Sequence, residues 1–421
     1  MKKLFYVLGA VMLLAGCSDE PQTEPGQEEP APTQEVEPVQ EVEPVQEVEI
    51  SLSAAESRAA EATQTFGYDF FAAMSTTQGI DKNMVCSPAS ASILLSMLAN
   101  ASTADRRAEI LAALGCDDLD ALNSLANKEL TQLPLSDAQV ALKYANAFWY
   151  RDRLTLNPAF GKTMADSYDM EAYARKFDLA FTEEVNAWVK DKTKGIIPAI
   201  LESVPDEECV AILANALYFK GAWANKFDKS DTKRRKFNGI NGPTTVYMML
   251  SGDAQFYAEA DDFQAVKLKF GSKGYEAIFV LPAIGADFDT FISSGALRRA
   301  GEALYSKEDM TLAFPRFKFR SDKMDINGPL GRMGIKDINN FSKLTAFTED
   351  VEARHDISQK IGVEFNEEGA EAAAVTVTGM VTAPGPGSGL GLVVQFDRPF
   401  IFMIREATTG AILFAGHIVK L

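Results

Sequence analysis

The sequence contains very little histidine, the residue on which most hydrolase triads and zinc sites depend. Only two histidines occur among 421 residues, His355 and His417. Each stands alone in the sequence, and we expect a surface or capping role for both. The chain also lacks a Cys-x-x-Cys pair, which argues against zinc binding and redox chemistry. No metal ion and no cofactor are therefore predicted.

Cysteine is also scarce, with four residues in the whole chain. Cys17 belongs to a separate N-terminal signal described below. The other three, Cys86, Cys116 and Cys209, cannot all pair with one another. We therefore expect them to be buried as small hydrophobic side chains and predict no disulfide framework.

Positive charge is in deficit, because 41 Lys and Arg residues against 59 Asp and Glu residues give a net charge of −18. Nucleic acids and anionic membrane surfaces attract stripes of Lys and Arg, so neither is expected as a partner. Much of the negative charge is local. Twelve acidic residues and no basic residue occur from Ser18 to Glu56, and the globular remainder is only mildly acidic.

The N-terminus carries the features of an export signal. Lys2 and Lys3 precede an apolar run over residues 4–14 that is too short to span a bilayer. Residues 14–17, Leu-Ala-Gly-Cys, resemble the lipobox of bacterial lipoproteins, in which the signal peptide is cut before the cysteine and the thiol is lipidated. The resemblance implies a signal peptide over residues 1–16 and a membrane anchor through lipid on Cys17.

Acidic residues at positions 19 and 20 resemble the surface-export signal of some outer-membrane lipoproteins. This resemblance implies an outer-membrane lipoprotein that faces either the cell surface or the periplasm. Residues 17–52 are rich in Glu, Gln, Pro and Val, and a hexamer that begins at Gln34 is repeated from Gln40. Spaced prolines and like charges prevent core formation, so this segment is predicted to be an extended solvated tether.

A folded domain is predicted over residues 53–421. A helix should begin near Ser53, and a second helix is indicated by Ser87 as its cap and Pro88 in its first turn. Helices dominate the first third of the domain, and β-rich segments follow. Strands that come after helices, without regular alternation, indicate an α+β fold. The predicted strands cover residues 210–219, 265–270, 276–281, 310–319, 393–404 and 411–419.

Three other segments have superficial likenesses to chemical sites. The glycine-rich stretch over 385–391 lacks the spacing and the Lys-Ser or Lys-Thr ending of a phosphate loop, so we interpret it as a flexible loop. Glu367 and Glu368 would point to opposite faces if they lay on a strand, which excludes an acid–base pair. The aromatic and basic residues over 314–319 are explained by alternation about Pro315 in an edge strand.

The most informative segment begins at Phe365. A glycine is followed by a run of the smallest side chains and then by alternating β-branched residues, and no proline occurs from Ile361 to Ala383. Such a segment can enter a sheet as a strand, because small side chains fit between neighbours and every residue has a ladder donor. An Ala-rich helical turn followed by an edge strand is the alternative. Six of the eight residues from Pro384 to Gly391 are Gly or Pro.

This segment resembles the hinge and reactive-centre loop of inhibitory serpins. Further motifs match the same family in order, from about residue 65 to the C-terminus: residues 83–93 around Ser87-Pro88, residues 145–148, residues 185–189, residues 213–223, residues 312–319, residues 398–402 and residues 413–416. The resemblance implies a serpin fold with three β-sheets, eight to nine helices and an exposed reactive-centre loop over about residues 367–395.

The resemblance also assigns roles to individual residues. The hinge residues would be Glu367, Gly369, Ala370, Glu371, Ala372, Ala373 and Ala374. The shutter and breach residues, which lie beneath and at the entrance of the central sheet, would be Ser87, Ser90, Asn215, Trp223 and Gln359. Gln359 stands where many animal serpins have histidine, so we expect its amide to hydrogen-bond to Asn215. Ala370 stands at a hinge position that is usually Thr or Ser.

The function implied is inhibition of serine proteases and not enzymatic catalysis. The target protease would cut the loop, form a covalent acyl complex and be trapped when the loop inserts. Counting from Gly369 places the scissile bond at Thr382-Ala383, with Met380 and Val381 as alternatives, because Pro384 would disfavour cleavage after Ala383. Small and medium apolar residues there favour elastase-like or subtilisin-like proteases. We expect a monomer.

Overall fold

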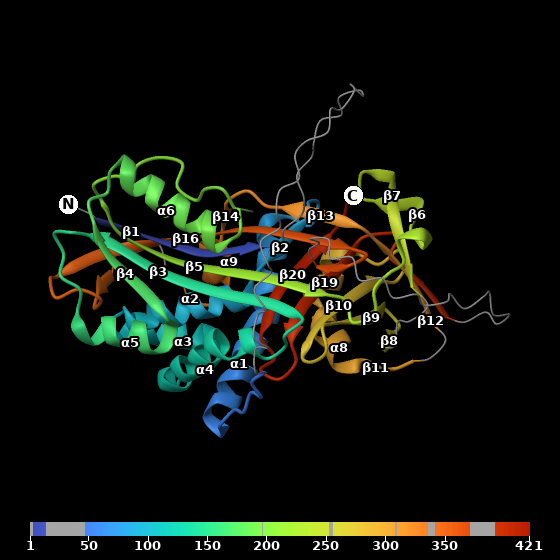
Figure 1. Ribbon diagram of the computed structural model, residues 1–421, viewed down its shortest axis with the longest axis horizontal. Helices are drawn as coiled ribbons and strands as arrows, with labels where there is room; N and C mark the ends of the chain where they lie inside the picture. The colour runs from blue at the N-terminus through green and yellow to red at the C-terminus, as the bar shows by residue number, and fades with distance from the viewer. Residues whose placement is uncertain are drawn as a thin grey trace, which may run out of the picture.

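The computed structural model describes residues 3–13, 47–195, 197–251, 256–307, 310–335, 342–370 and 392–421, with the backbone alone for 3–13 and 354–356. Within these ranges nine α-helices and three β-sheets form an α+β fold, as predicted (Figure 1). The helices are α1 (Ala54–Gln78), α2 (Pro88–Asn100), α3 (Ala104–Leu114), α4 (Leu119–Thr131), α5 (Pro158–Tyr168), α6 (Leu179–Lys192), α7 (Phe288–Ser293), α8 (Ala296–Ala303) and α9 (Asn327–Arg332). None of these helices is both long and apolar enough to cross a membrane.

The central sheet is the largest of the three. Its strands are β1 (Lys3–Leu13), β3 (Val140–Arg151), β4 (Met170–Arg175), β5 (Cys209–Ala222), β13 (Phe317–Arg320), β14 (Met324–Asp325), β15 (Ser342–Leu344), β16 (Val351–Asn366) and β17 (Gly369–Ala370). Across the sheet β4, β3 and β5 come first, then β1 and β17 end to end, then β16 with the three short strands on its far side.

Two smaller sheets pack at the other end of the molecule. The seven-stranded sheet has the order β11 (Tyr305–Ser306), β8 (Phe256–Ala260), β9 (Phe263–Phe270), β10 (Tyr275–Pro282), β19 (Phe400–Glu406), β20 (Ile412–Ile418) and β2 (Met84–Cys86). The four-stranded sheet has the order β18 (Leu392–Gln395), β12 (Met310–Pro315), β7 (Gly242–Ser251) and β6 (Lys233–Gly239). Phe279, Phe314, Phe365 and Phe400 join the three sheets in one aromatic core.

Local signals set the starts of the first two helices. Ser53 caps α1 and forms a capping box with Glu56, whose side chain accepts from the Ser53 amide at 2.6 Å. Lys128 bonds the same carboxylate at 2.6 Å and lowers the pKa of Glu56 to about 2. Ser87 caps α2 and Pro88 occupies its first turn, as predicted.

The helices cover both faces of the central sheet. Helix α6 packs on one face over β3 and β5, while α2 lies against the other face (Figure 1). The cluster beneath α6 includes Trp149, Phe181 and Ile212, all fully buried or nearly so. This arrangement holds β5 between two apolar layers, with β3 paired to one of its edges and β1 and β17 to the other.

Two predicted strands are each divided between sheets. Residues 393–404 form β18 and β19, which separate before Pro399, and residues 310–319 form β12 and β13, which separate at Arg316. Both strands divide next to a proline, because proline has no backbone N–H to donate to a neighbouring strand. The edge position predicted for residues 314–319 is confirmed in two pieces: Phe314 and Pro315 pair with β7 alone, and β13 pairs with β16 alone among the described strands, although β12 as a whole lies inside its sheet.

The boundary predicted between the tether and the folded domain also needs correction. Glu47 forms an ion pair of 2.6 Å with Lys273, and the Val48 amide donates to the Leu135 carbonyl at 3.0 Å. Residues 47–52 therefore lie on the folded body and are not solvated tether. Residues 14–46 lie outside the described part of the chain.

Candidate functional site

The site begins where β5 ends, at Trp223. Its backbone amide donates to the Glu368 carbonyl and its indole Nε1 to the Asn366 carbonyl, both at 2.9 Å. The ring stacks on Phe270 with 4.4 Å between centroids, and Phe365 packs 5.9 Å away on the end of β16. Trp223 therefore joins the end of β5 to the turn that follows β16. Its role at the breach stays a prediction.

The two adjacent glutamates each hold the chain between β16 and β17 to a different group. Glu367 is 3% exposed, and its Oε1 accepts from Arg316 at 2.6 Å and from the Thr232 hydroxyl at 2.7 Å. Glu368 pairs with two lysines, which lower the pKa of its carboxyl; the Lys226 hydrogen bond has the larger effect and that of Lys229 the smaller. These ion pairs fix the point from which the loop departs.

Glu367 and Glu368 form no acid–base pair, but the reason given from sequence was wrong. Both lie in the turn between β16 and β17 rather than on a strand. Sequence analysis also missed their partners. Arg316 is 51 positions from Glu367, and no local pattern links the two.

Gly369 is required by its surroundings. Its φ is +150°, and a Cβ atom there would lie 2.1 Å from the Gly221 carbonyl oxygen. Beyond it, Ala370 pairs with Gly221 on one side and with Phe365 on the other, and its side chain is fully buried. Two of the predicted hinge residues, Gly369 and Ala370, thus already form a strand between β5 and β16. The predicted hinge residues Glu371 to Ala374 and the predicted scissile bond lie outside the described residues.

Below β17, strand β1 fills the same gap between β5 and β16. It runs parallel to both, with Leu4 opposite Cys209 at one end and Leu13 opposite Tyr218 at the other. Residues 3–13 of the segment predicted to be a signal peptide are therefore a strand of the central sheet. We call the gap between β5 and β16 the strand slot. It is long enough for an 11-residue strand with ladder partners on both sides.

The shutter lies behind the middle of the strand slot. The Gln359 amide donates to the Ser87 carbonyl at 3.0 Å, and its Oε1 accepts from the Ser87 amide at 3.2 Å. The Ser87 hydroxyl donates to the Leu413 carbonyl at 2.8 Å and accepts from the Ser90 amide at 3.3 Å. These bonds connect β16, the start of α2 and β20.

The predicted hydrogen bond between Gln359 and Asn215 is absent. Strand β1 runs between them, because Leu8 and Val11 are opposite the neighbours of both residues. Two strand spacings put the two backbones about 10 Å apart. Asn215 instead donates to the Asn146 Oδ1 at 2.7 Å. In the described part of the chain its own Oδ1, like the Ser90 hydroxyl oxygen, is buried without a partner.

The histidine prediction was wrong for His417, which lies in the core and not at a surface or cap. It is fully buried, with Nδ1 3.2 Å from the Ser75 hydroxyl and Nε2 2.7 Å from the Lys82 carbonyl. Burial lowers its pKa to about 4. The side chain of His355 lies outside the described atoms. Neither the sequence nor the structure gives His417 a catalytic partner.

No disulfide joins Cys86, Cys116 and Cys209, the three cysteines in the described part of the chain. Cys86 and Cys209 are buried, and burial raises the pKa of the Cys86 thiol. Cys116 is half-buried rather than buried, and burial also raises its pKa. The described residues contain no group of three or more His, Cys, Asp or Glu side chains that could hold a metal ion.

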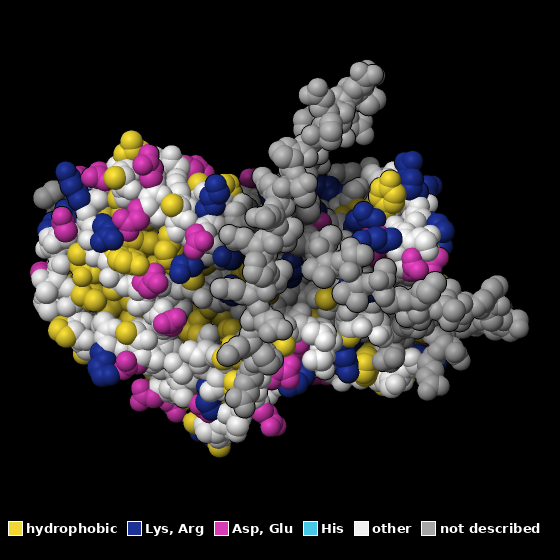
Figure 2. All heavy atoms as spheres, in the orientation of Figure 1, with side chains coloured by type: hydrophobic (Ala, Val, Ile, Leu, Met, Phe, Trp, Pro, Cys, Tyr) yellow, Lys and Arg dark blue, Asp and Glu magenta, His cyan; other side chains and the backbone are white. Residues whose placement is uncertain are grey.

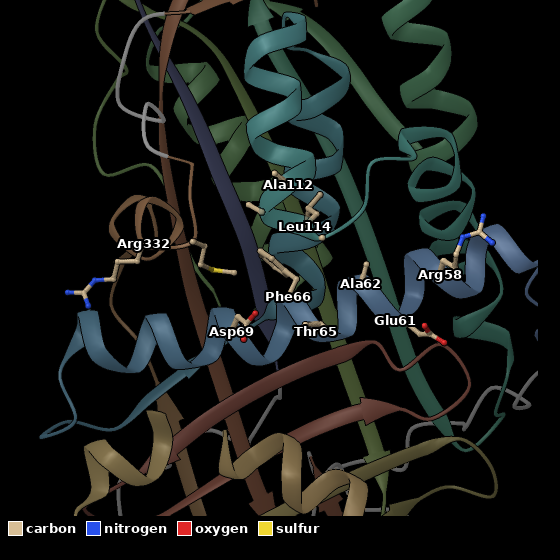
Figure 3. Close-up of a pocket in the computed structure, with 12 residues that line it drawn as sticks. Arg58, Glu61, Ala62, Thr65, Phe66, Asp69, Ala112, Leu114 and Arg332 are labelled. Carbon is tan, nitrogen blue, oxygen red and sulfur yellow. The ribbon is translucent and has the colours of Figure 1, made fainter. Parts of the chain in front are cut away.

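A pocket of about 610 Å³ lies away from the hinge, between α1, α3 and α9 (Figure 3). Its centre is apolar around Phe66 and Leu114. Arg58 and Arg332 lie at its opposite ends with their guanidinium groups directed outward. Charged groups that converge on one point are what a substrate site needs, and this arrangement does not provide them. The predicted hinge and the strand slot therefore remain the candidate functional site.

The fold combines nine helices with a large central sheet and two smaller sheets in the described residues, and Gly369 and Ala370 are paired between β5 and β16 in the central sheet. The family model described as serpin (serine protease inhibitor) matches residues 61–421. The chain belongs to the serpin family, a family of protease inhibitors.

Curated relatives include Serpin-ZX of Arabidopsis thaliana, 30% identical over 372 residues that cover 82% of this chain and 93% of that protein. Serpin-Z1C of Triticum aestivum is 30% identical over 369 residues, which cover 80% of this chain and 90% of that one. Among solved structures, the thermophilic serpin tengpin in its native state has a TM-score of 0.75 at 25% identity, covering 90% and 96% of the two chains.

Proposed function

We propose that this serpin inhibits serine proteases by the trapping mechanism of inhibitory members of its family. The observation that carries the proposal is the buried Ala370, already paired on both sides at the top of the strand slot. Glu371 is followed by three alanines, whose small side chains would fit between neighbouring strands once the slot is empty. The protease would attack the loop, form an acyl-enzyme and be displaced before water could hydrolyse the ester.

The dimensions of the sheet are compatible with this mechanism. About 14 residues at about 3.3 Å each give an inserted strand of roughly 45 Å. Ladder bonds contribute about 1 kcal/mol each, so insertion with its apolar burial would release on the order of 10 kcal/mol. The state with the loop outside the sheet must then be held by a kinetic barrier.

We further propose that cleavage before Cys17 prepares the chain for inhibition. Before such cleavage β1 occupies most of the strand slot and would block the loop. Removal of residues 1–16 would empty the slot, and lipid on Cys17 would anchor the protein at the outer membrane. The acidic tether would give the inhibitor reach from that membrane.

The target proteases are proposed to be elastase-like or subtilisin-like, with cleavage at Thr382-Ala383. Incubation of the processed protein with both classes should give complexes that survive detergent and boiling. Mass spectrometry should find the released C-terminal fragment beginning between Val381 and Ala383. A cleaved chain without a stable complex would contradict inhibition, and a fragment beginning beyond Gly385 would contradict the bond assignment.

A further inference from the structure

Strand β6 begins with four consecutive cations, Lys233, Arg234, Arg235 and Lys236, which we call the basic patch. Such a cluster is unusual in a chain of net charge −18. Alternate residues of a strand share a face, so Arg234 and Lys236 lie on the exposed face, while exposed Lys233 and half-buried Arg235 lie on the face of buried Phe237. Figure 2 shows Lys and Arg gathered at the end of the molecule where β6 and β7 lie.

No member of the basic patch has an acidic partner within the described ranges. Lys233 donates to the Ser230 carbonyl at 2.9 Å, and Arg235 donates to the Gln395 side chain at 3.2 Å. Two nearby cations, in contrast, do have acidic partners: Arg316 pairs with Glu367 and Lys226 with Glu368. The charge of the basic patch is therefore available to a partner.

An exposed aromatic residue adjoins these cations. Tyr247 on β7 is directly opposite Arg234, and 55% of its surface is exposed. The Arg316 guanidinium lies over its ring, 5.2 Å from the centroid. Val393 on β18 is 58% exposed in the same sheet. Tyr and Arg are enriched in protein–protein interfaces, so this surface fits a protein better than a purely anionic polymer.

The position of the surface connects it to the loop. Strand β18 begins at Leu392, directly after residues 371–391, and the bond from Arg235 to Gln395 ties β6 to the end of β18. A protease that engages the loop would thus be held beside the four-stranded sheet. Complementary charge across such a contact speeds association more than it strengthens binding.

We propose that the basic patch and Tyr247 form a docking surface for an acidic region beside the active-site cleft of the target protease. This inference rests on the proposed function and adds that the preferred targets are proteases with an acidic face. Docking acts before cleavage. It should therefore raise the rate of complex formation and leave the stoichiometry of inhibition unchanged.

The test compares a triple variant, Lys233→Gln, Arg234→Gln and Lys236→Gln, with wild type. Arg235 is left in place because of its bond to Gln395. The matched control changes three exposed cations around α6, by Lys176→Gln, Lys190→Gln and Lys194→Gln. With an acidic subtilisin-like protease at low salt, the patch variant should associate about 10-fold more slowly than the control, and the difference should shrink at high salt.

Tyr247→Ala should slow association at high salt as well, because its contribution is not screened. Equal rates for the patch variant and the control would overturn the proposal. It would also be overturned if the patch mattered only when heparin was added, since the partner would then be a polyanion. If wild type forms no covalent complex, the proposed function fails. The docking surface is then tested separately, by measuring at low salt how the patch variant and the control bind a protease whose catalytic serine is replaced by alanine.

Discussion

Replacing Gln359 by leucine should lower the free energy of unfolding by an amount that can be worked out from the contacts of its side chain. The side chain is 1% exposed and makes two hydrogen bonds to the backbone of Ser87. The Ser87 carbonyl also accepts from the Ala91 amide at 3.1 Å, so it keeps a partner in the variant. The Ser87 amide keeps none. Two lost bonds at about 0.5–1 kcal/mol each, with one buried donor left unpaired at about 1–2 kcal/mol, give roughly 3 kcal/mol.

Thermal unfolding of the Gln359→Leu variant measures this loss. An unfolding entropy of about 2.1 cal/mol/K per residue over roughly 370 folded residues converts 3 kcal/mol into a decrease in Tm of about 4 °C. The control is Glu352→Gln, an exposed position on the same strand, where a change within about 0.5 kcal/mol is expected. If the Tm of Gln359→Leu fell no further than that of the control, the amide would not be clamping β16 to α2.

The remaining predictions concern the core, the hinge and the anchor. Burial lowers the pKa of His417 to about 4, against 6.5 in the unfolded chain, so the unfolded state binds more protons between these pH values. The free energy of unfolding should therefore fall by about 3 kcal/mol as the pH drops from 6.5 to 4. The His417→Gln variant should lack this decrease, and identical pH profiles for the variant and wild type would contradict the prediction. Gly369→Ala should expel the hinge from the slot, because its Cβ would meet the Gly221 carbonyl, and proteolysis near the hinge should become faster; unchanged proteolysis would argue against it. Metabolic labelling with palmitate should mark wild type but not Cys17→Ser, and equal labelling would refute the anchor.

Local signals predicted the parts of the fold that depend on neighbouring residues. The cap at Ser53 and the Ser87-Pro88 pair correctly predicted the starts of α1 and α2. The hinge and breach roles come from the family motifs and stay predictions.

Contacts across long stretches of sequence were not predictable in the same way. Arg316 meets Glu367 because β12 ends next to the hinge, and nothing in either segment indicates that meeting. Gln359 was assigned the wrong partner because the occupation of the strand slot by β1 decides how far β5 lies from β16. His417 was misplaced because a single buried polar residue in an apolar strand has the same sequence pattern as an exposed one.

We expect the hinge to enter the strand slot after the protease has cut the loop, and a single substitution in the hinge can test this insertion. Ala370 is buried in the slot, so Ala372, two residues further along the same strand, should follow with its side chain on the same face. Ala372→Arg would require an unpaired cation to be buried, at a cost of several kcal/mol, while Glu371→Gln would place its side chain on the opposite face.

The measurement is the stoichiometry of boiling-resistant complexes with an elastase-like or subtilisin-like protease, for the processed wild type and both variants. Wild type and Glu371→Gln should form complexes, whereas Ala372→Arg should be cut at the same bond and released as a substrate. Complexes of Ala372→Arg at the wild-type stoichiometry would contradict insertion of the loop into the slot in this register.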